Sequence, residues 1–137
     1  MSIHPTAVVD ADAKIAEDVR IGPYAVIGPG VVLSAGVSVG HHASVTGPTT
    51  IGAQTKIFSY AAIGGDAQDK KYAGEDAFLS VGERNIFREY ATVNRGTRGG
   101  HTTIGDDNLF MAYSHVAHDA TIGNHCAFAN SANIAGH

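Results

Sequence analysis

IHPTAVVDADAKIAEDVRIGPYAVIGPGVVLSAGVSVGHHASVTGPTTIGAQTKIFSYAAI, residues 3–63, carries an aliphatic residue at every sixth position. Stepping by six from Ile3 meets only Ile, Leu and Val, at Val9, Ile15, Ile21, Ile27, Leu33, Val39, Val45, Ile51, Ile57 and Ile63. A small residue follows four positions after each of the first ten, for example Ala7, Ala25 and Thr55. This period fits neither the 3.6-residue turn of a helix nor the alternation of a long strand.

A period of six indicates short strands separated by corners, with a large side chain inward on each flat side and a small one inward near each corner. Glycine follows several of the aliphatic residues, as at Gly22, Gly40 and Gly52, and can relieve a corner. Three such sides form a triangular coil of about 18 residues, and coils stack at the interstrand spacing of roughly 4.8 Å. The sequence therefore predicts an all-β, parallel β-helix.

The repeat is interrupted twice. It returns at Val81, Phe87 and Val93, then shifts phase and runs through Ile104, Phe110, Val116, Ile122, Phe128 and Ile134. Between residues 65 and 80 the six-step positions fall on Asp69 and Glu75, which cannot face an apolar interior unpaired. We expect residues 65–80 and 95–103 to form two external loops.

Composition excludes several classes of protein. A net charge of −4 without a run of Lys or Arg argues against nucleic-acid or anionic-membrane binding. The N-terminus lacks a secretory signal and no apolar stretch is long enough to span a membrane, so we expect a cytoplasmic protein. Cys126 is the only cysteine and occupies a small inward position, which predicts a buried structural thiol.

Four histidines lie in the last part of the chain. Since residues 18 apart stack in this coil, Gly136 should lie over His118 and His137 over Asp119, with His118 facing outward. Three interpretations remain open: solvated surface histidines, a zinc site made by His115, His118 and His137, or a general base for acyl transfer beside an amide donor. The segment RGTRGG (residues 95–100) is only a weak match to a phosphate-binding loop, and its Arg95 and Arg98 are interpreted as surface charges.

The strings QDKKYAGE, NRGT, HVAHD and AFANSANIAGH resemble segments of the hexapeptide-repeat UDP-N-acetylglucosamine O-acyltransferases, and the resemblance spans nearly the whole chain. It implies a left-handed coil and a homotrimer with active sites between subunits. The implied activity is transfer of a 3-hydroxyacyl chain from acyl carrier protein to the 3-hydroxyl of UDP-N-acetylglucosamine, the first step of lipid A biosynthesis. No metal or cofactor is implied.

The resemblance also assigns roles to residues of this chain. By its motif, His118 is the general base, Asp119 orients it, and the Gly136 amide stabilises the oxyanion. The remaining residues are implied to bind substrate: Gln68, Asp69, Lys71, His115 and His137.

Members of the resembled family continue through further coils and a C-terminal helical domain, whereas this sequence stops at His137. We therefore expect one β-helix domain over residues 1–137, without that helical domain, whose open end is frayed or paired with another molecule. A truncated or engineered noncatalytic structural module is the alternative function, and the related N-acyltransferase is a third. Acyl-chain length is not encoded in any pattern found here.

Overall fold

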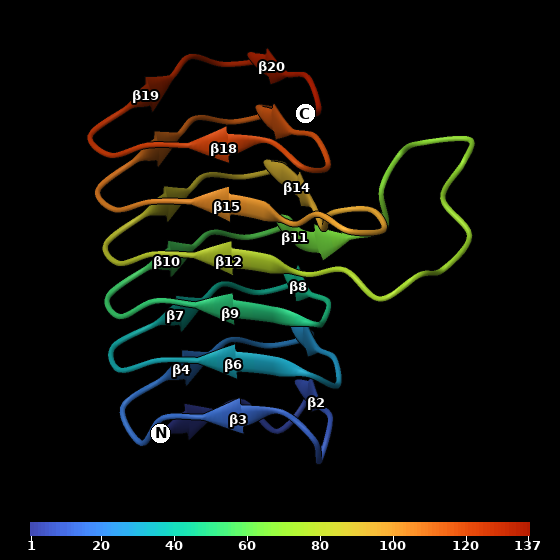
Figure 1. Ribbon diagram of the computed structural model, residues 1–137. Coiled ribbons are helices and arrows are strands. Elements are labelled where there is room, and N and C mark those ends of the chain that lie inside the picture. Colours follow the sequence, from blue (N-terminus) through green and yellow to red (C-terminus); the bar gives the residue numbers. More distant parts are fainter.

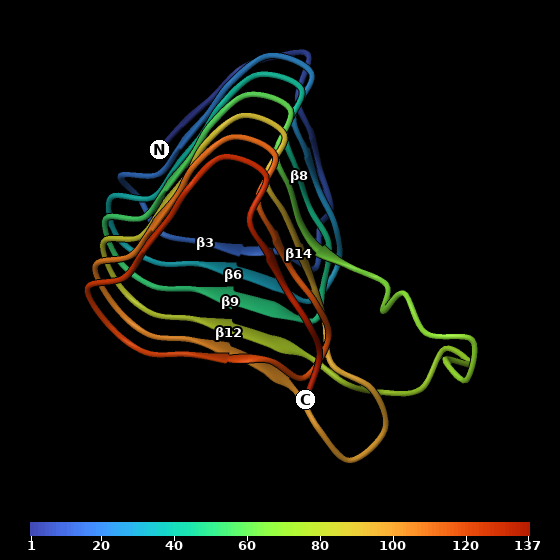
Figure 2. The ribbon, with the colours of Figure 1, turned by 90° about the horizontal axis from the view of Figure 1, so that it is seen from above.

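The computed structural model describes residues 1–137, and it is built from short strands and corners with no helix. The strands wind as a left-handed parallel β-helix with a triangular cross-section (Figures 1 and 2). The predicted all-β fold and its two external loops are confirmed. No helix in this structure could cross a membrane.

Each side of the triangle is one parallel sheet, called here sheets A, B and C. Sheet A contains β1 (Ser2–Ile3), β4 (Arg20–Ile21), β7 (Ser38–Val39), β10 (Lys56–Ile57), β13 (Ile86–Phe87), β16 (Leu109–Phe110) and β19 (Ala127–Phe128). Sheet B contains β2 (Val8–Val9), β5 (Val26–Ile27), β8 (Ser44–Val45), β11 (Ala62–Gly65), β14 (Thr92–Asn94), β17 (His115–Val116) and β20 (Asn133–Ile134). Sheet C contains β3 (Lys14–Ile15), β6 (Val31–Leu33), β9 (Thr49–Ile51), β12 (Leu79–Val81), β15 (Thr102–Ile104) and β18 (Thr121–Ile122).

The inward positions of the repeat form a single core that runs along the axis of the coil. In most strands the inward residue is aliphatic and stacks on its counterpart in the next coil, as Ile21 does on Val39. In the upper coils of sheet A aromatic rings replace aliphatic side chains, and the Phe110 ring stacks between Phe87 and Phe128 with centroids 4.7 and 5.0 Å apart. Burying these faces supplies the main driving force for folding, because no single coil can cover its own apolar residues.

The register changes where the loops leave the coil. Facing residues are 18 apart in the first coils, as for Thr6 and Tyr24, and 30 apart for Thr55 and Asn85 across the first loop. Across the second loop the offset is 23, as for Asn85 and Asn108. The loops are shorter than predicted, because Gly65, Leu79, Ser80, Thr102 and Thr103 belong to strands.

One corner carries a ladder of buried amides rather than small apolar residues. Asn108 donates from Nδ2 to the Asn85 side-chain oxygen at 3.0 Å, and its own side-chain oxygen accepts from the Cys126 amide at 2.8 Å. Cys126 was predicted to be a buried thiol, and this is wrong: it is half-buried, since no further coil of the chain lies over it.

Candidate active site

The two external loops and the last corner of the chain lie at the same edge of the triangle, where sheet B turns into sheet C. Viewed down the axis, both loops project from this edge, and the C-terminal end of the chain lies beside them (Figure 2). The first loop connects β11 to β12 and the second connects β14 to β15. Residues distant in sequence therefore meet at one site on a rigid scaffold.

His118 and Asp119 form the centre of this site. His118 donates from Nδ1 to Asp119 Oδ2 at 2.9 Å, because an ionised carboxylate can only accept. This bond leaves the Nε2 lone pair of His118 free. The His118 side chain points away from the core, as predicted, but it is only 12% exposed because Asp69 and His137 flank it.

Asp119 is held in its ionised form by its neighbours. Burial opposes ionisation, but the Thr97 hydroxyl donates to Oδ2 at 2.6 Å and the Thr97 amide donates to Oδ1 at 3.0 Å. Together with the bond from His118 and the nearby His137, these interactions lower the pKa of Asp119 below its usual value. The carboxylate is therefore a fixed negative partner for His118.

Gly136 lies against His118, and His137 lies over Asp119, so the predicted stacking is confirmed. A Cβ at Gly136 would come 2.6 Å from the His118 carbonyl oxygen and 2.9 Å from its ring Cε1, a space that only glycine leaves open. The His137 amide donates to that carbonyl at 3.3 Å, whereas the Gly136 amide has no hydrogen-bond partner in the chain. A free N–H thus lies next to a free imidazole lone pair.

Arg95 is buried and holds the first loop, so its interpretation as a surface charge was wrong. Its guanidinium, 8% exposed, donates to the Gly64 carbonyl, to Asp66 and to the Tyr72 hydroxyl. Inside the loop the Asp69 carboxylate accepts from the Lys71 amide at 2.9 Å. These bonds bring Asp69 Oδ2 to 4.0 Å from His118 Nε2.

The remaining predicted binding residues lie at different distances from this centre. Lys71 lines a cleft of about 450 Å³ between the two loops, together with Asp69, Glu75, Thr97, Arg98 and His137. Arg98 is exposed, as expected. Gln68 is exposed and makes no hydrogen bond within the chain.

His115 lies on β17, before the corner that carries His118. Its Nδ1 forms a 2.7 Å hydrogen bond with the Thr92 hydroxyl. Burial, assisted by the nearby His118, lowers the pKa of His115. His115 is therefore neutral at pH values where a free histidine begins to take up a proton. It does not join the group of Asp69, His118 and His137 whose ligand atoms lie close together.

The sequence of the chain matches the model of a known protein family. The family model of the bacterial transferase hexapeptide (six repeats) matches residues 1–35 and 101–136, slightly more than half of the chain. The chain belongs to the bacterial transferase hexapeptide family. The family model does not match residues 36–100 of this hexapeptide-repeat protein, a segment that contains the first loop, where the six-residue pattern is broken.

Within the family, the chain is similar to one enzyme type along nearly its whole length. It is 54% identical over 137 residues to the acyl-[acyl-carrier-protein]–UDP-N-acetylglucosamine O-acyltransferase of Stenotrophomonas maltophilia, covering 98% of this chain and 52% of the relative. A solved UDP-N-acetylglucosamine acyltransferase superposes with a TM-score of 0.97 at 46% identity, covering all of this chain and 54% of that one. The enzyme from Francisella novicida gives 0.96 at 39% identity, covering 98% and 50%. This hexapeptide protein thus spans about half the length of the relatives it matches.

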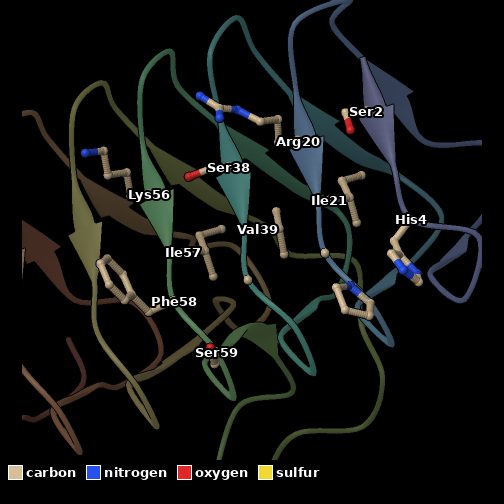
Figure 3. Close-up of a pocket in the computed structure, with 13 residues that line it drawn as sticks. Ser2, His4, Arg20, Ile21, Ser38, Val39, Lys56, Ile57, Phe58 and Ser59 are labelled. Carbon is tan, nitrogen blue, oxygen red and sulfur yellow. The ribbon is translucent and has the colours of Figure 1, made fainter.

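A groove on another face of this hexapeptide-repeat protein is separate from the site around His118. It holds about 470 Å³ and lies on sheet A, with Arg20 and Lys56 toward one end of the strands and His4 and Phe58 toward the other (Figure 3). Small residues such as Ser38 are among those that line it. Unlike the loop corner, it offers no imidazole–carboxylate pair.

Two residues of the site escaped the sequence analysis. Thr97 holds Asp119, and the Thr102 hydroxyl accepts from the Asp119 amide at 2.9 Å. Thr97 lies in the string NRGT, which carries part of the family resemblance, but nothing in its spacing indicates a bond to a residue 22 positions away. A long loop usually needs a side chain that holds it to the scaffold, and this requirement could have pointed to Arg95.

Proposed function

We propose that this chain carries the active site of an acyltransferase that moves a 3-hydroxyacyl group from acyl carrier protein to the 3-hydroxyl of UDP-N-acetylglucosamine. The single observation that carries the proposal is His118, fixed by Asp119 with its Nε2 free, beside the unpaired amide of Gly136. The similarity to O-acyltransferases named for these substrates supports the choice of donor and acceptor.

In the proposed reaction His118 Nε2 accepts the proton of the sugar 3-hydroxyl as the oxygen attacks the thioester carbonyl. The Gly136 amide donates to the oxyanion of the tetrahedral intermediate. Collapse of the intermediate breaks the carbon–sulfur bond, and the leaving thiolate takes the proton back from His118. Asp119 stabilises the transient imidazolium, because its lowered pKa keeps it charged throughout.

The cleft between the loops is the proposed entry for the charged part of a substrate. Lys71 and Arg98 give it two cations that suit phosphate oxygens. Asp69 lies between this cleft and His118, where it can accept from a hydroxyl of the sugar or of the acyl chain. Homotrimer assembly, a cytoplasmic location and a role in the first step of lipid A biosynthesis belong to the same proposal.

Acyl transfer from 3-hydroxyacyl carrier protein to UDP-N-acetylglucosamine tests the proposal in purified protein. His118→Ala should reduce kcat by about 10²–10⁴-fold, the usual contribution of a general base, while leaving the circular dichroism spectrum unchanged. His125→Asn is the matched control, since His125 lies at another corner and its positive φ of 57° is tolerated by asparagine. Near-normal turnover in His118→Ala would remove the proposed role, and absence of substrate binding by the unmodified chain would favour a structural module.

A further inference from the structure

Asp69, His118 and His137 each offer a metal-binding atom, and these atoms lie within 4.8 Å of one another. We propose that this trio binds a divalent transition-metal ion of the Zn²⁺ type, and that the bound ion blocks His118. The metal site stands on geometry alone, whereas the inhibition rests on the proposed function.

The contacts behind His118 are those of a metal-binding histidine. Histidines that bind metals usually donate their other ring N–H to a carboxylate, which fixes the tautomer and strengthens the ligand. His118 makes this contact with Asp119 at 2.9 Å, and Thr97 holds Asp119 in turn. His118 Nε2 is therefore presented with its lone pair toward Asp69 Oδ2, 4.0 Å away.

The ligand atoms of the trio are spaced closely enough to share one ion. Three atoms no more than 4.8 Å apart have a common point within about 2.8 Å of each, and Zn²⁺ bonds to His and Asp are about 2.0–2.2 Å long. Each ligand must therefore move inward by less than about 1 Å. Asp69 lies on an external loop, and the His137 side chain is 68% exposed, so both can make that adjustment.

The donor atoms and their surroundings determine which ion the trio favours. Two imidazoles and one carboxylate favour Zn²⁺ and its transition-metal neighbours over Mg²⁺ or Ca²⁺, which prefer oxygen ligands. Three protein ligands leave a fourth position open toward the cleft between the loops. Lys71 and Arg98 line that cleft and oppose a cation, while Glu75 and the ionised Asp119 favour it.

This trio differs from the zinc triad considered from sequence. In the structure His115 is occupied with Thr92, and the third ligand is the carboxylate of Asp69 from the first loop. The ion would take the same Nε2 lone pair of His118 that accepts the hydroxyl proton in the proposed reaction. Metal binding and acyl transfer are then mutually exclusive, and zinc acts as a competitive inhibitor.

The test begins with zinc binding to the 137-residue chain, measured by competition with a chromophoric chelator, and with Co²⁺ absorption as a report of tetrahedral coordination. We expect one ion per chain. Asp69→Asn and His137→Asn should each weaken binding by at least about tenfold, and Asp119→Asn, which removes only the supporting contact, by about 10–100-fold.

The control variant is His125→Asn, which like His137→Asn replaces a histidine at a φ near 60°. His125 lies at another corner, outside the group of Asp69, His118 and His137. Loss of binding in this control, or full binding in Asp69→Asn and His137→Asn, would therefore overturn the site. Circular dichroism of each variant confirms folding.

An activity measurement separates the two proposals. Zinc should inhibit acyl transfer by the wild-type protein, and a chelator should restore it. If the trio binds zinc but turnover is unaffected at saturation, the inhibitory role is wrong. If His118→Ala retains turnover while the wild-type chain binds zinc through the trio, the proposed base is wrong and the metal site stands.

Discussion

Replacement of Arg95 by methionine should release the first loop without unfolding the coil. Methionine fills the volume of the buried stem but leaves the Gly64 carbonyl, itself buried, without its donor. An unpaired buried carbonyl costs about 1–3 kcal/mol, and loss of the Tyr72 hydrogen bond adds about 1 kcal/mol. The ion pair with Asp66 adds little, because that carboxylate is 70% exposed and screened by water.

The expected local destabilisation is therefore about 2–4 kcal/mol, which corresponds to a rise of about 30- to 700-fold in the population of the open loop. Hydrogen exchange followed by mass spectrometry measures this directly. Peptides covering residues 66–78 should lose protection in Arg95→Met, while peptides from β5 and β8 keep theirs. Zinc binding through Asp69 should weaken in the same variant.

Arg88→Met is the matched control, because Arg88 is exposed, pairs with Glu89 and makes no contact with the loop. Unchanged exchange of residues 66–78 in Arg95→Met would refute the anchoring role. Loss of protection throughout the coil would refute the view that the loop opens as a unit separate from the scaffold.

Three other predictions concern the core and the site. The pKa of His115 lies below its ordinary value of 6.5, so just below that pH the unfolded chain binds more protons than the folded one. The free energy of unfolding should therefore fall as the pH drops. His115→Gln should flatten this pH dependence, measured by urea titrations at several pH values. Gly136→Ala places a methyl group against the His118 ring and should lower the rate of acyl transfer about 100-fold with little change in Tm. A large drop in Tm would instead show a structural defect. Phe110→Ala should lower the free energy of unfolding by about 3–5 kcal/mol, and Phe128→Ala by less, since Phe128 is only half-buried and stacks on one ring; equal losses in chemical denaturation would contradict the packing.

The fold and part of the site could be predicted because both follow from periodicity. The inward position on each flat side must be apolar in every coil, which makes the repeat visible from Ile3 to Ile63. The same periodicity placed Gly136 against His118, since no loop intervenes between those two coils. Where stacking is regular, a separation in sequence converts directly into a distance.

The contacts made across the loops could not be predicted in this way. The two insertions change the offset between facing residues to 30 and 23, so Asp69 and Thr97 have no fixed partner in the sequence. Burial of Arg95 depends on how the first loop folds back over it, which local patterns do not encode. Cys126 differs for another reason: its inward position was correct, but its burial depends on a covering coil.

The proposed chemistry and the proposed metal site both need a free lone pair on His118 Nε2, so both depend on which ring nitrogen carries the proton. A long-range ¹H–¹⁵N spectrum of the ¹⁵N-labelled chain at alkaline pH reports which ring nitrogen carries the proton. We expect the proton on Nδ1, bonded to Asp119, and a loss of this preference in Asp119→Asn. A proton on Nε2 would contradict it, since no lone pair would then face Gly136 and Asp69.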